Sequence, residues 1–228
     1  MNLRQRILAS LRQEGLKGTV LKVAGIGLER WFDARYGTDT CTRSQLEDLT
    51  IDSANKERGM IYEPTRVMPL MRLFPALRKI MPENSVLVDL GCGKGRVLLV
   101  ASHCGFREVR GIEFAQELCD IAKKNIAIYK SRTGIQTEIK IIHADVTRYA
   151  IEDEENVFFA FNPFDETIFS QVIDNIAASL RRRPRKILIV NARLSATYRE
   201  ILERQTAFAP LKELRYWGWD FSLYSNRD

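Results

Sequence analysis

An acidic residue followed by alternating glycines offers the clearest chemistry in the sequence. The segment 86–96 reads VLVDLGCGKGR, in which an apolar run ends in Asp89 and leads into Gly91, Gly93 and Gly95. Glycines let the backbone turn tightly and approach a ligand without interference from a Cβ atom. An acid two residues before the first glycine would repel a pyrophosphate and attract a cation. The turn is therefore predicted to bind a cationic ligand that carries no phosphate.

Two phosphate-binding turns compete with this interpretation. A P-loop requires GxxxxGK followed by Ser or Thr, which is absent, and a dinucleotide-binding fold prefers GxGxxG with a pyrophosphate at the helix N-terminus. The spacing here is GxGxG. S-adenosylmethionine fits the charge pattern, because it carries an ammonium and a sulfonium group and no phosphate. An NAD-binding reductase remains the alternative, which Asp89 and the spacing disfavour.

Two further acids close the next apolar runs along the chain. Glu113 and Phe114 end one run, and Asp145 and Val146 end the following one. The carboxyl ends of parallel strands meet at one edge of an open α/β sheet, where ligands bind. A carboxylate at one strand tip can accept both ribose hydroxyls, and a carboxylate at the next can accept from an adenine amino group. The strand-tip acid Glu113 is expected to be partly exposed.

Alternating strands and helices are predicted to position these acids. From residue 85 onward, short apolar runs alternate with helical patterns, which is typical of βαβ units. The predicted strands are 86–90, 108–113, 138–143, 157–161, 186–191, 211–217 and 221–225, and the predicted helices are 94–103, 115–129, 166–181 and 196–204. The last two strands are expected to form a hairpin around Gly218-Trp219-Asp220. The fold class is a doubly wound, mainly parallel seven-stranded α/β sheet in a domain at 61–228, after an N-terminal helical extension at 1–60.

The acids and glycines together resemble motifs I, II and III of the class I S-adenosylmethionine-dependent methyltransferases. The resemblance covers roughly residues 60–226 and implies a Rossmann-like methyltransferase fold. It implies that Glu113 binds the ribose and that Asp145 binds the adenine, with Phe114 and Val146 as apolar walls. It also implies that the methionine end is bound by Asp89, Gly91, Cys92, Gly93 and Gly95.

A possible acceptor motif follows the fourth predicted strand, where residues 159–164 read FAFNPF. This segment resembles the (Asn/Asp)-Pro-Pro-(Tyr/Phe) motif of amino-methylating enzymes, in which the amide and a proline carbonyl bind the acceptor nitrogen. One proline is missing, so the aromatic residue lies one position closer. The resemblance implies that Asn162 is catalytic and lies beside the cofactor. A proline turn after a buried strand is the alternative.

The segment Tyr62-Glu63-Pro64-Thr65 is predicted to open the helix before the first strand, because Pro is common in a first helical turn. It resembles the Tyr-x-Pro-Thr segment that precedes motif I in some protein-lysine methyltransferases and helps to cover the cofactor. The resemblance implies that both residues lie at the site, Tyr62 as a catalytic residue and Thr65 as a cofactor-binding residue. A lysine acceptor, whose pKa is near 10.4, must first lose a proton. Glu63, Asp165 or water is expected to take it.

Composition sets limits on partners. The formal charge of +6 permits an acidic partner without requiring one.

Residues 3–11 are predicted to form a basic amphipathic helix packed on the domain, with peripheral membrane contact as the alternative. The run RRRPRK at 181–186 is expected to be a solvated loop opposite the cofactor. The four cysteines show no CxxC pair and no zinc spacing with His103 or His143, so we expect no metal site and a reduced, cytoplasmic protein.

The favoured function is methyl transfer from S-adenosylmethionine to a nitrogen, with a protein side chain as the acceptor. A nucleic-acid base and a small molecule are the alternative acceptors. A non-catalytic protein that binds S-adenosylmethionine is the alternative of a different class.

The charge argument predicts the ligand. Calorimetry should show that the protein binds S-adenosylmethionine or S-adenosylhomocysteine and does not bind NAD, because Asp89 would repel a pyrophosphate. Tight NAD binding without a response to either adenosyl ligand would overturn the assignment of the glycine turn.

Overall fold

The computed structural model describes residues 27–42, 49–50, 55–58 and 62–226, together with Gly15, Gly25 and Ser44. The strands are β1 (Val86–Leu90), β2 (Glu108–Glu113), β3 (Glu138–His143), β4 (Glu155–Ala160), β5 (Leu188–Ala192), β6 (Phe208–Tyr216) and β7 (Trp219–Asn226). The labelled helices are the 3-10 turn η2 (Lys56–Arg58), α2 (Val67–Arg78), α3 (Arg96–Ala101), α4 (Gln116–Thr133), α5 (Glu166–Arg182) and α6 (Ala196–Arg204).

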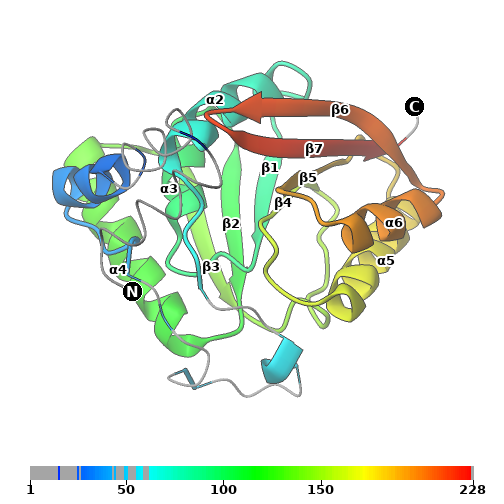
Figure 1. Ribbon diagram of the computed structural model, residues 1–228, viewed down its shortest axis with the longest axis horizontal. Helices are drawn as coiled ribbons and strands as arrows, with labels where there is room; N and C mark the ends of the chain where they lie inside the picture. Colours follow the sequence, from blue (N-terminus) through cyan, green and yellow to red (C-terminus); the bar gives the residue numbers. More distant parts are fainter. Residues whose placement is uncertain are drawn as a thin grey trace.

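All seven strands form one sheet in the order β3-β2-β1-β4-β5-β7-β6 (Figure 1). Strands β1 to β5 are parallel, and β7 runs antiparallel between β5 and β6. The chain order reverses between β1 and β4, and ligands bind at such a switch point in open α/β sheets. The predicted doubly wound, seven-stranded fold is confirmed.

Side chains of the parallel strands alternate between two apolar layers. Leu87 and Phe159 face the layer that contains α2 and α3, whereas Val88 and Phe158 face the layer that contains α5. Figure 1 shows α3 and α4 on the opposite side of the strands from α5 and α6. Because both faces are covered, every residue of β1 is buried, including its one acid.

Helix α2 begins at Val67, so the expected helix start at Pro64 is wrong. The residues from Tyr62 to Arg66 are not helical, and Arg66 has extended backbone angles. The first amide of the helix is instead capped by Glu29, whose carboxylate accepts from the Val67 N–H at 3.0 Å. This cap comes from a residue far upstream, so the local sequence pattern does not reveal it.

The C-terminal hairpin also differs from the prediction. Its turn is Trp217-Gly218, and Trp219 belongs to β7, paired with Tyr216. Both turn residues have positive φ, at 54° and 75°. That geometry is the type I′ turn of two-residue hairpins, whose twist matches the flanking strands. The expected loop Gly218-Trp219-Asp220 was wrong because an aromatic residue, Trp217, takes the left-handed position ahead of the glycine.

Three element boundaries also differ slightly from the prediction. Strand β4 ends at Ala160, which leaves Phe161 just beyond the strand, and β5 begins at Leu188 rather than at residue 186. Helix α3 starts at Arg96 rather than at Lys94, because Gly95 still has a left-handed backbone with φ of 84°.

Part of the N-terminal extension lies on the domain. Residues 27–36 are helical, and Phe32 stacks on Tyr129 of α4 with ring centroids 5.9 Å apart. The predicted basic helix at 3–11 lies outside the described residues. Within the described ranges, no helix has the length and apolar character needed to cross a membrane.

The arginine run is only partly a solvated loop. Arg182 donates to the Ile151 carbonyl at 2.7 Å, and Arg185 donates to the Glu155 carbonyl at 2.7 Å. These two side chains therefore connect the end of α5 and the loop after it to the start of β4 and the segment before it. Arg181 and Arg183 are exposed.

A buried guanidinium at the amino edge of the sheet is surrounded by acidic side chains. Arg110 is 3% exposed and contacts four carboxylates at 2.6–2.8 Å. These belong to Glu108, Glu152, Glu154 and Glu155. Glu155 is fully buried, and removing one partner from such a group leaves an uncompensated charge in the interior.

The Arg110 cluster yields a prediction for stability. Arg110→Leu should lower the free energy of unfolding by about 3–5 kcal/mol, because Glu155 loses its cation. Arg107→Leu is the matched control, since Arg107 is half-exposed and lies 3.8 Å from Glu154. Its loss should stay below about 1 kcal/mol. Urea denaturation measures the free energy of unfolding of both variants. Equal losses would show that the buried Arg110 cluster stabilises the fold no more than the exposed Arg107 does.

Candidate functional site

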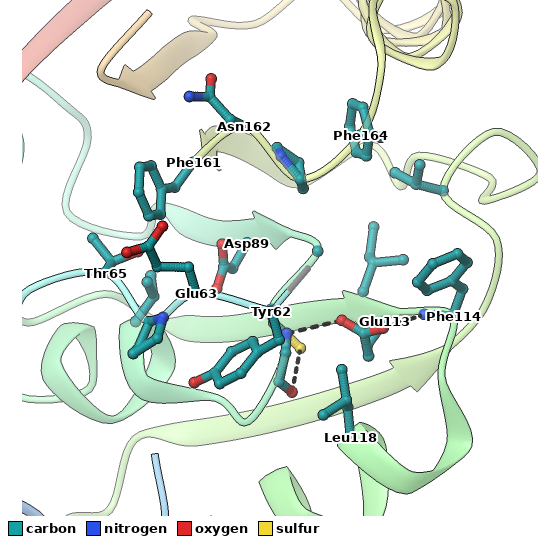
Figure 2. Close-up of a pocket in the computed structure, with 18 of the residues that line it drawn as sticks. Tyr62, Glu63, Thr65, Asp89, Glu113, Phe114, Leu118, Phe161, Asn162 and Phe164 are labelled. Atoms are coloured by element: carbon teal, nitrogen blue, oxygen red, sulfur yellow. Dashed lines mark hydrogen bonds between the residues drawn. The ribbon is translucent and has the colours of Figure 1, made fainter. Parts of the chain in front are cut away.

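A cavity of about 390 Å³ lies at the carboxyl edge of the parallel strands. Its size is within the usual range for a small-molecule or cofactor site. The predicted site residues that line it are Tyr62, Thr65, Asp89, Gly91, Cys92, Gly93, Glu113, Phe114, Asp145, Val146 and Asn162. Figure 2 shows Asp89, Glu63 and Phe161 toward one end of this cavity and Glu113 and Phe114 toward the other.

Gly95 is the predicted cofactor residue that does not line the cavity. Its left-handed backbone ends the turn before α3, and a Cβ there would lie 3.3 Å from Ala122 of α4. Its role is therefore to pack α3 closely against α4 rather than to touch a ligand.

Asp89 is a buried acid without a hydrogen-bond partner among the described residues. Asp89 lines the cavity, and 3% of its surface is exposed. Burial raises its pKa well above the usual range, and the nearby carboxylate of Glu113 raises it further. Such a group is destabilising when ionised and unpaired, so it favours a cationic ligand that replaces the lost hydration.

The glycine turn is shaped around its neighbours. The amides of Gly91 and Cys92 both donate to the Ile112 carbonyl at 3.0 Å, which fixes the turn to the end of β2. Gly93 has a φ of 52°, and a Cβ at this position would overlap the ring of Tyr62. A glycine is therefore required both for the backbone conformation and for the contact with Tyr62.

Glu113 is 4% exposed, so the expectation of a partly exposed acid is wrong. One oxygen accepts from the Gly93 amide at 2.9 Å, and the other accepts from the amides of Phe114 and Ala115 at 3.0 Å. Burial raises its pKa, and these three amides oppose that effect. A carboxylate has about four acceptor positions. About one acceptor position of Glu113 is therefore left for a ligand.

Asp145 lies just beyond β3 and is held by its neighbours. One oxygen accepts from the amide and the hydroxyl of Thr147 at 2.9 and 2.7 Å, and the other accepts from the Asn55 side chain at 2.9 Å. Asn55 also lines the cavity. No sequence pattern indicates Asn55, because it belongs to a separate segment without a recognisable motif.

The two histidines are not in the cavity wall. A ring nitrogen of His143 lies 3.1 Å from the Phe114 carbonyl, and His103 packs edge-on against Tyr129. Neither is placed to act on a ligand in the cavity.

The tip of β4 has an unusual backbone. Asn162 has a φ of 41°, and its side-chain Nδ2 lies 3.4 Å from the Arg193 carbonyl beyond β5. Because a carbonyl can only accept, the amide must present nitrogen there, which leaves Oδ1 available as an acceptor. Arg193 also lines the cavity and was not predicted from the sequence.

Residues upstream of α2 close the outer wall. The Tyr62 hydroxyl donates to the Thr40 carbonyl at 2.9 Å, and burial raises the pKa of this phenol. Glu63 lines the cavity, and its side chain is exposed. Asp165 does not line the cavity, because it caps α5 and pairs with Arg58 at 2.8 Å.

Arg96 joins the glycine turn to the extension. Its guanidinium is 2% exposed, pairs with Glu29 and donates to the Thr40 hydroxyl at 2.8 Å. It also donates to the Cys41 sulfur at 2.9 Å and to the Thr65 carbonyl at 3.3 Å. The sequence places Arg96 at the end of the turn, but no local sequence pattern indicates its partners upstream.

Comparison with known proteins agrees with this geometry. Residues 87–183 match a family model described as a methyltransferase domain. This span runs from β1 to the end of α5 and contains the three acids of the cavity. The chain thus has the fold of the class I S-adenosylmethionine-dependent methyltransferases, with a methyltransferase domain at residues 87–183. Its cofactor is S-adenosylmethionine, whose cationic groups suit the unpartnered Asp89.

One relative of this methyltransferase is a Dictyostelium discoideum protein named histone-lysine N-methyltransferase, H3 lysine-79 specific. The two are 38% identical over 147 residues, which are 59% of this chain and 8% of that protein. The methyltransferase chain thus spans a small part of the length of its relative.

Two solved structures share the fold of this methyltransferase. A magnesium protoporphyrin IX methyltransferase from Synechocystis with bound S-adenosylmethionine has a TM-score of 0.54 and 13% identity, covering 71% of this chain and 79% of that one. An RNA methyltransferase from Salinibacter ruber with S-adenosylhomocysteine also has a TM-score of 0.54, with 20% identity over 72% and 94% of the two chains. At these identities the likeness concerns the fold alone.

Asp89 gives a prediction with a defined sign. Its raised pKa means that the folded, ligand-free protein holds this proton more tightly than the unfolded chain does. The resulting stability is fully present below the unfolded pKa, near 3.9, and is lost as pH rises through the raised folded value. Asp89→Asn should therefore raise the Tm of the ligand-free protein at pH 8 and weaken S-adenosylmethionine binding at least tenfold, about 1.4 kcal/mol.

Asp145→Asn is the matched control for this experiment. The Asp145 carboxylate accepts three hydrogen bonds, and an amide nitrogen cannot accept. This variant should lower the Tm. Thermal unfolding without ligand and calorimetry with ligand measure the two effects. A lower Tm for Asp89→Asn at pH 8 would contradict the account of an unpaired buried carboxylate.

Proposed function

We propose that this methyltransferase transfers the methyl group to an amine nitrogen of a protein side chain, with lysine as the favoured acceptor. The observation that carries the proposal is the tip of β4. There Asn162, in a left-handed conformation, lines the cofactor cavity with its amide nitrogen held by Arg193.

The donor would lie along the strand tips. Asp89 and the turn through Gly91 and Gly93 would hold the methionine end, because the ammonium and sulfonium groups supply the missing cation. Glu113 would accept from one ribose hydroxyl, and the adenine would extend toward Asp145. Phe114 and Val146 would form apolar walls beside it, with Cys92 in the turn below.

The acceptor nitrogen would then lie beside β4. Strands β1 and β4 are neighbours at the switch point, so a methyl group near Asp89 faces the tip of β4. The Asn162 Oδ1 can accept from the attacking amine without adding a charge near the sulfonium. Holding the lone pair in line with the methyl carbon supplies much of the rate enhancement in a direct displacement.

A lysine ammonium must lose a proton before it attacks. Glu63 is the candidate acceptor of that proton, because it lines the cavity whereas Asp165 does not. The Tyr62 hydroxyl is held by a carbonyl, which favours a covering role for Tyr62 over proton transfer. Thr65 is buried in the same wall and would help to cover the cofactor.

The relative from Dictyostelium supports a protein acceptor, because its name specifies a histone lysine. All four cysteines of the chain are free thiols, which supports a reducing compartment such as the cytoplasm.

Asn162 variants test the proposal. Asn162→Ala and Asn162→Gly both remove the amide, but only glycine relieves the left-handed backbone. Both should lower turnover at least tenfold, about 1.4 kcal/mol in the barrier, and change S-adenosylmethionine affinity less than twofold. The Tm of the glycine variant should match or exceed that of the alanine variant.

Radiolabelled S-adenosylmethionine and fractionated lysate provide the assay. Label that resists nuclease and is released by protease identifies a protein acceptor, and amino-acid analysis then identifies the nitrogen. Normal turnover in Asn162→Gly would reduce Asn162 to a turn residue. Label found only in nucleic acid or in small molecules would refute the protein acceptor.

A further inference from the structure

A second side chain in the cavity wall carries information about the acceptor. Arg193 follows β5, which pairs with β4 at Ala160 and Asn191, so the tips of the two strands are adjacent. The Arg193 carbonyl accepts from the Asn162 amide, and Arg193 itself lines the cavity. The exposed Arg193 side chain thus starts directly beside the proposed acceptor contact.

The backbone at this position is strained. Among the described residues, Asn162, Arg193 and Trp217 are the non-glycine residues with positive φ. The hairpin turn explains Trp217, whereas the other two stand side by side at the cavity. Arg193 is held there by its N–H, which donates to the Asp220 carbonyl at 2.8 Å. Strain that the surroundings enforce at a cavity indicates a functional position.

The charge of Arg193 is not neutralised by an acid in the described part of the chain. Its guanidinium lies 5.7 Å from the centre of the Trp219 ring. Other arginines nearby do have acidic partners: Arg199 pairs with Glu213 at 3.1 Å, and Arg215 pairs with Asp220 at 3.2 Å. A guanidinium held by an aromatic ring and open to a cavity is prepared for bidentate binding of a carboxylate.

The second arginine over Trp219 is not equivalent. Arg66 lies 5.9 Å from the same ring, but it does not line the cavity. Arg193 is therefore the cation of this pair that remains for a ligand.

The sheet order separates Arg193 from the cofactor. Strand β4 lies between β1, which carries Asp89, and β5, which leads to Arg193. Neighbouring strands are about 4.8 Å apart, so the two side chains start from strands about 10 Å apart. A donor that extends from Asp89 over β2 and β3 leads away from Arg193. The anion that Arg193 binds is thus expected on the acceptor.

We propose that Arg193 selects an acceptor that carries a carboxylate next to the methylated amine, namely a lysine flanked by Asp or Glu in a peptide chain. This inference rests on the proposed function. A phosphate backbone fits less well, because it requires several unpaired cations, and Arg199 and Arg215 are already paired with acids.

Peptide binding to the enzyme saturated with S-adenosylhomocysteine tests the inference without turnover. Labelled peptides containing Glu-Lys-Glu, Gln-Lys-Gln or Lys-Lys-Lys are compared by fluorescence anisotropy. The parent protein should bind the glutamate peptide at least tenfold more tightly than the glutamine peptide. Arg193→Met should reduce this ratio below twofold, and Arg193→Glu should favour the lysine peptide.

Arg215→Met is the matched control, because Arg215 is exposed on the β6–β7 hairpin that carries Trp219 and does not line the cavity. It should keep the full preference for the glutamate peptide. Both Arg193 variants should bind S-adenosylhomocysteine as the parent does. The absence of a preference in the parent, or a preference that survives Arg193→Met, would overturn the inference.

Other outcomes separate this inference from the proposed function. If Arg193→Met loses S-adenosylhomocysteine binding, Arg193 holds the cofactor and the inference fails. If an RNA oligonucleotide outcompetes the glutamate peptide in an Arg193-dependent manner, the acceptor carries phosphate and the inference fails. An Arg193-dependent peptide preference without radiolabel transfer supports the inference and refutes lysine methylation. Equal methylation of all peptides supports the function and refutes the inference.

Discussion

The buried guanidinium of Arg96 ties the first described part of the chain to the cofactor turn. A buried cation must be matched by anions and acceptors, because an unpaired one is strongly destabilising. Glu29 supplies the charge and Thr40 a hydroxyl. Each of these two residues makes a second contact. The Glu29 carboxylate caps α2 at Val67, and the Thr40 carbonyl accepts from the Tyr62 hydroxyl. The contacts of this one buried side chain thus connect the start of α2 with the outer wall of the cavity.

The three acids of the cavity differ in what surrounds them, although all three lie near the carboxyl ends of neighbouring strands. Glu113 accepts three hydrogen bonds from the protein and Asp145 at least three, so they mainly hold the glycine turn and the segment after β3 in shape. Asp89 has no such donor among the described residues. An ionic ligand is therefore required most at Asp89, which holds the methionine end on our proposal. Glu113 and Asp145, the proposed adenosine contacts, offer a preformed surface with few remaining acceptor positions.

Local patterns in the sequence were sufficient to predict β1, β2, β3 and the acids near their carboxyl ends, because apolar runs and glycine turns act over short distances. They were insufficient wherever a distant partner decides the outcome. The start of α2 depends on Glu29, and Asn55 reaches Asp145 from another segment. The hairpin turn was misplaced since Trp217 has a backbone conformation that its residue type disfavours. Arg193 was missed for the same reason, because only the fold brings it beside Asn162.

The two edges of the sheet satisfy charge in opposite ways. At the amino edge, Arg110 is surrounded by carboxylates, and this arrangement stabilises the fold without leaving any capacity for a ligand. At the carboxyl edge, Asp89 lacks a cation and Arg193 lacks an anion within the described residues, and both line one cavity. S-adenosylmethionine supplies the cation, and on our proposal the acceptor supplies the anion. Because the two groups have opposite charges and lie on different strands, each ligand is directed to its own end of the cavity. On the same proposal, the amine and the methyl group meet between the two ends, at Asn162.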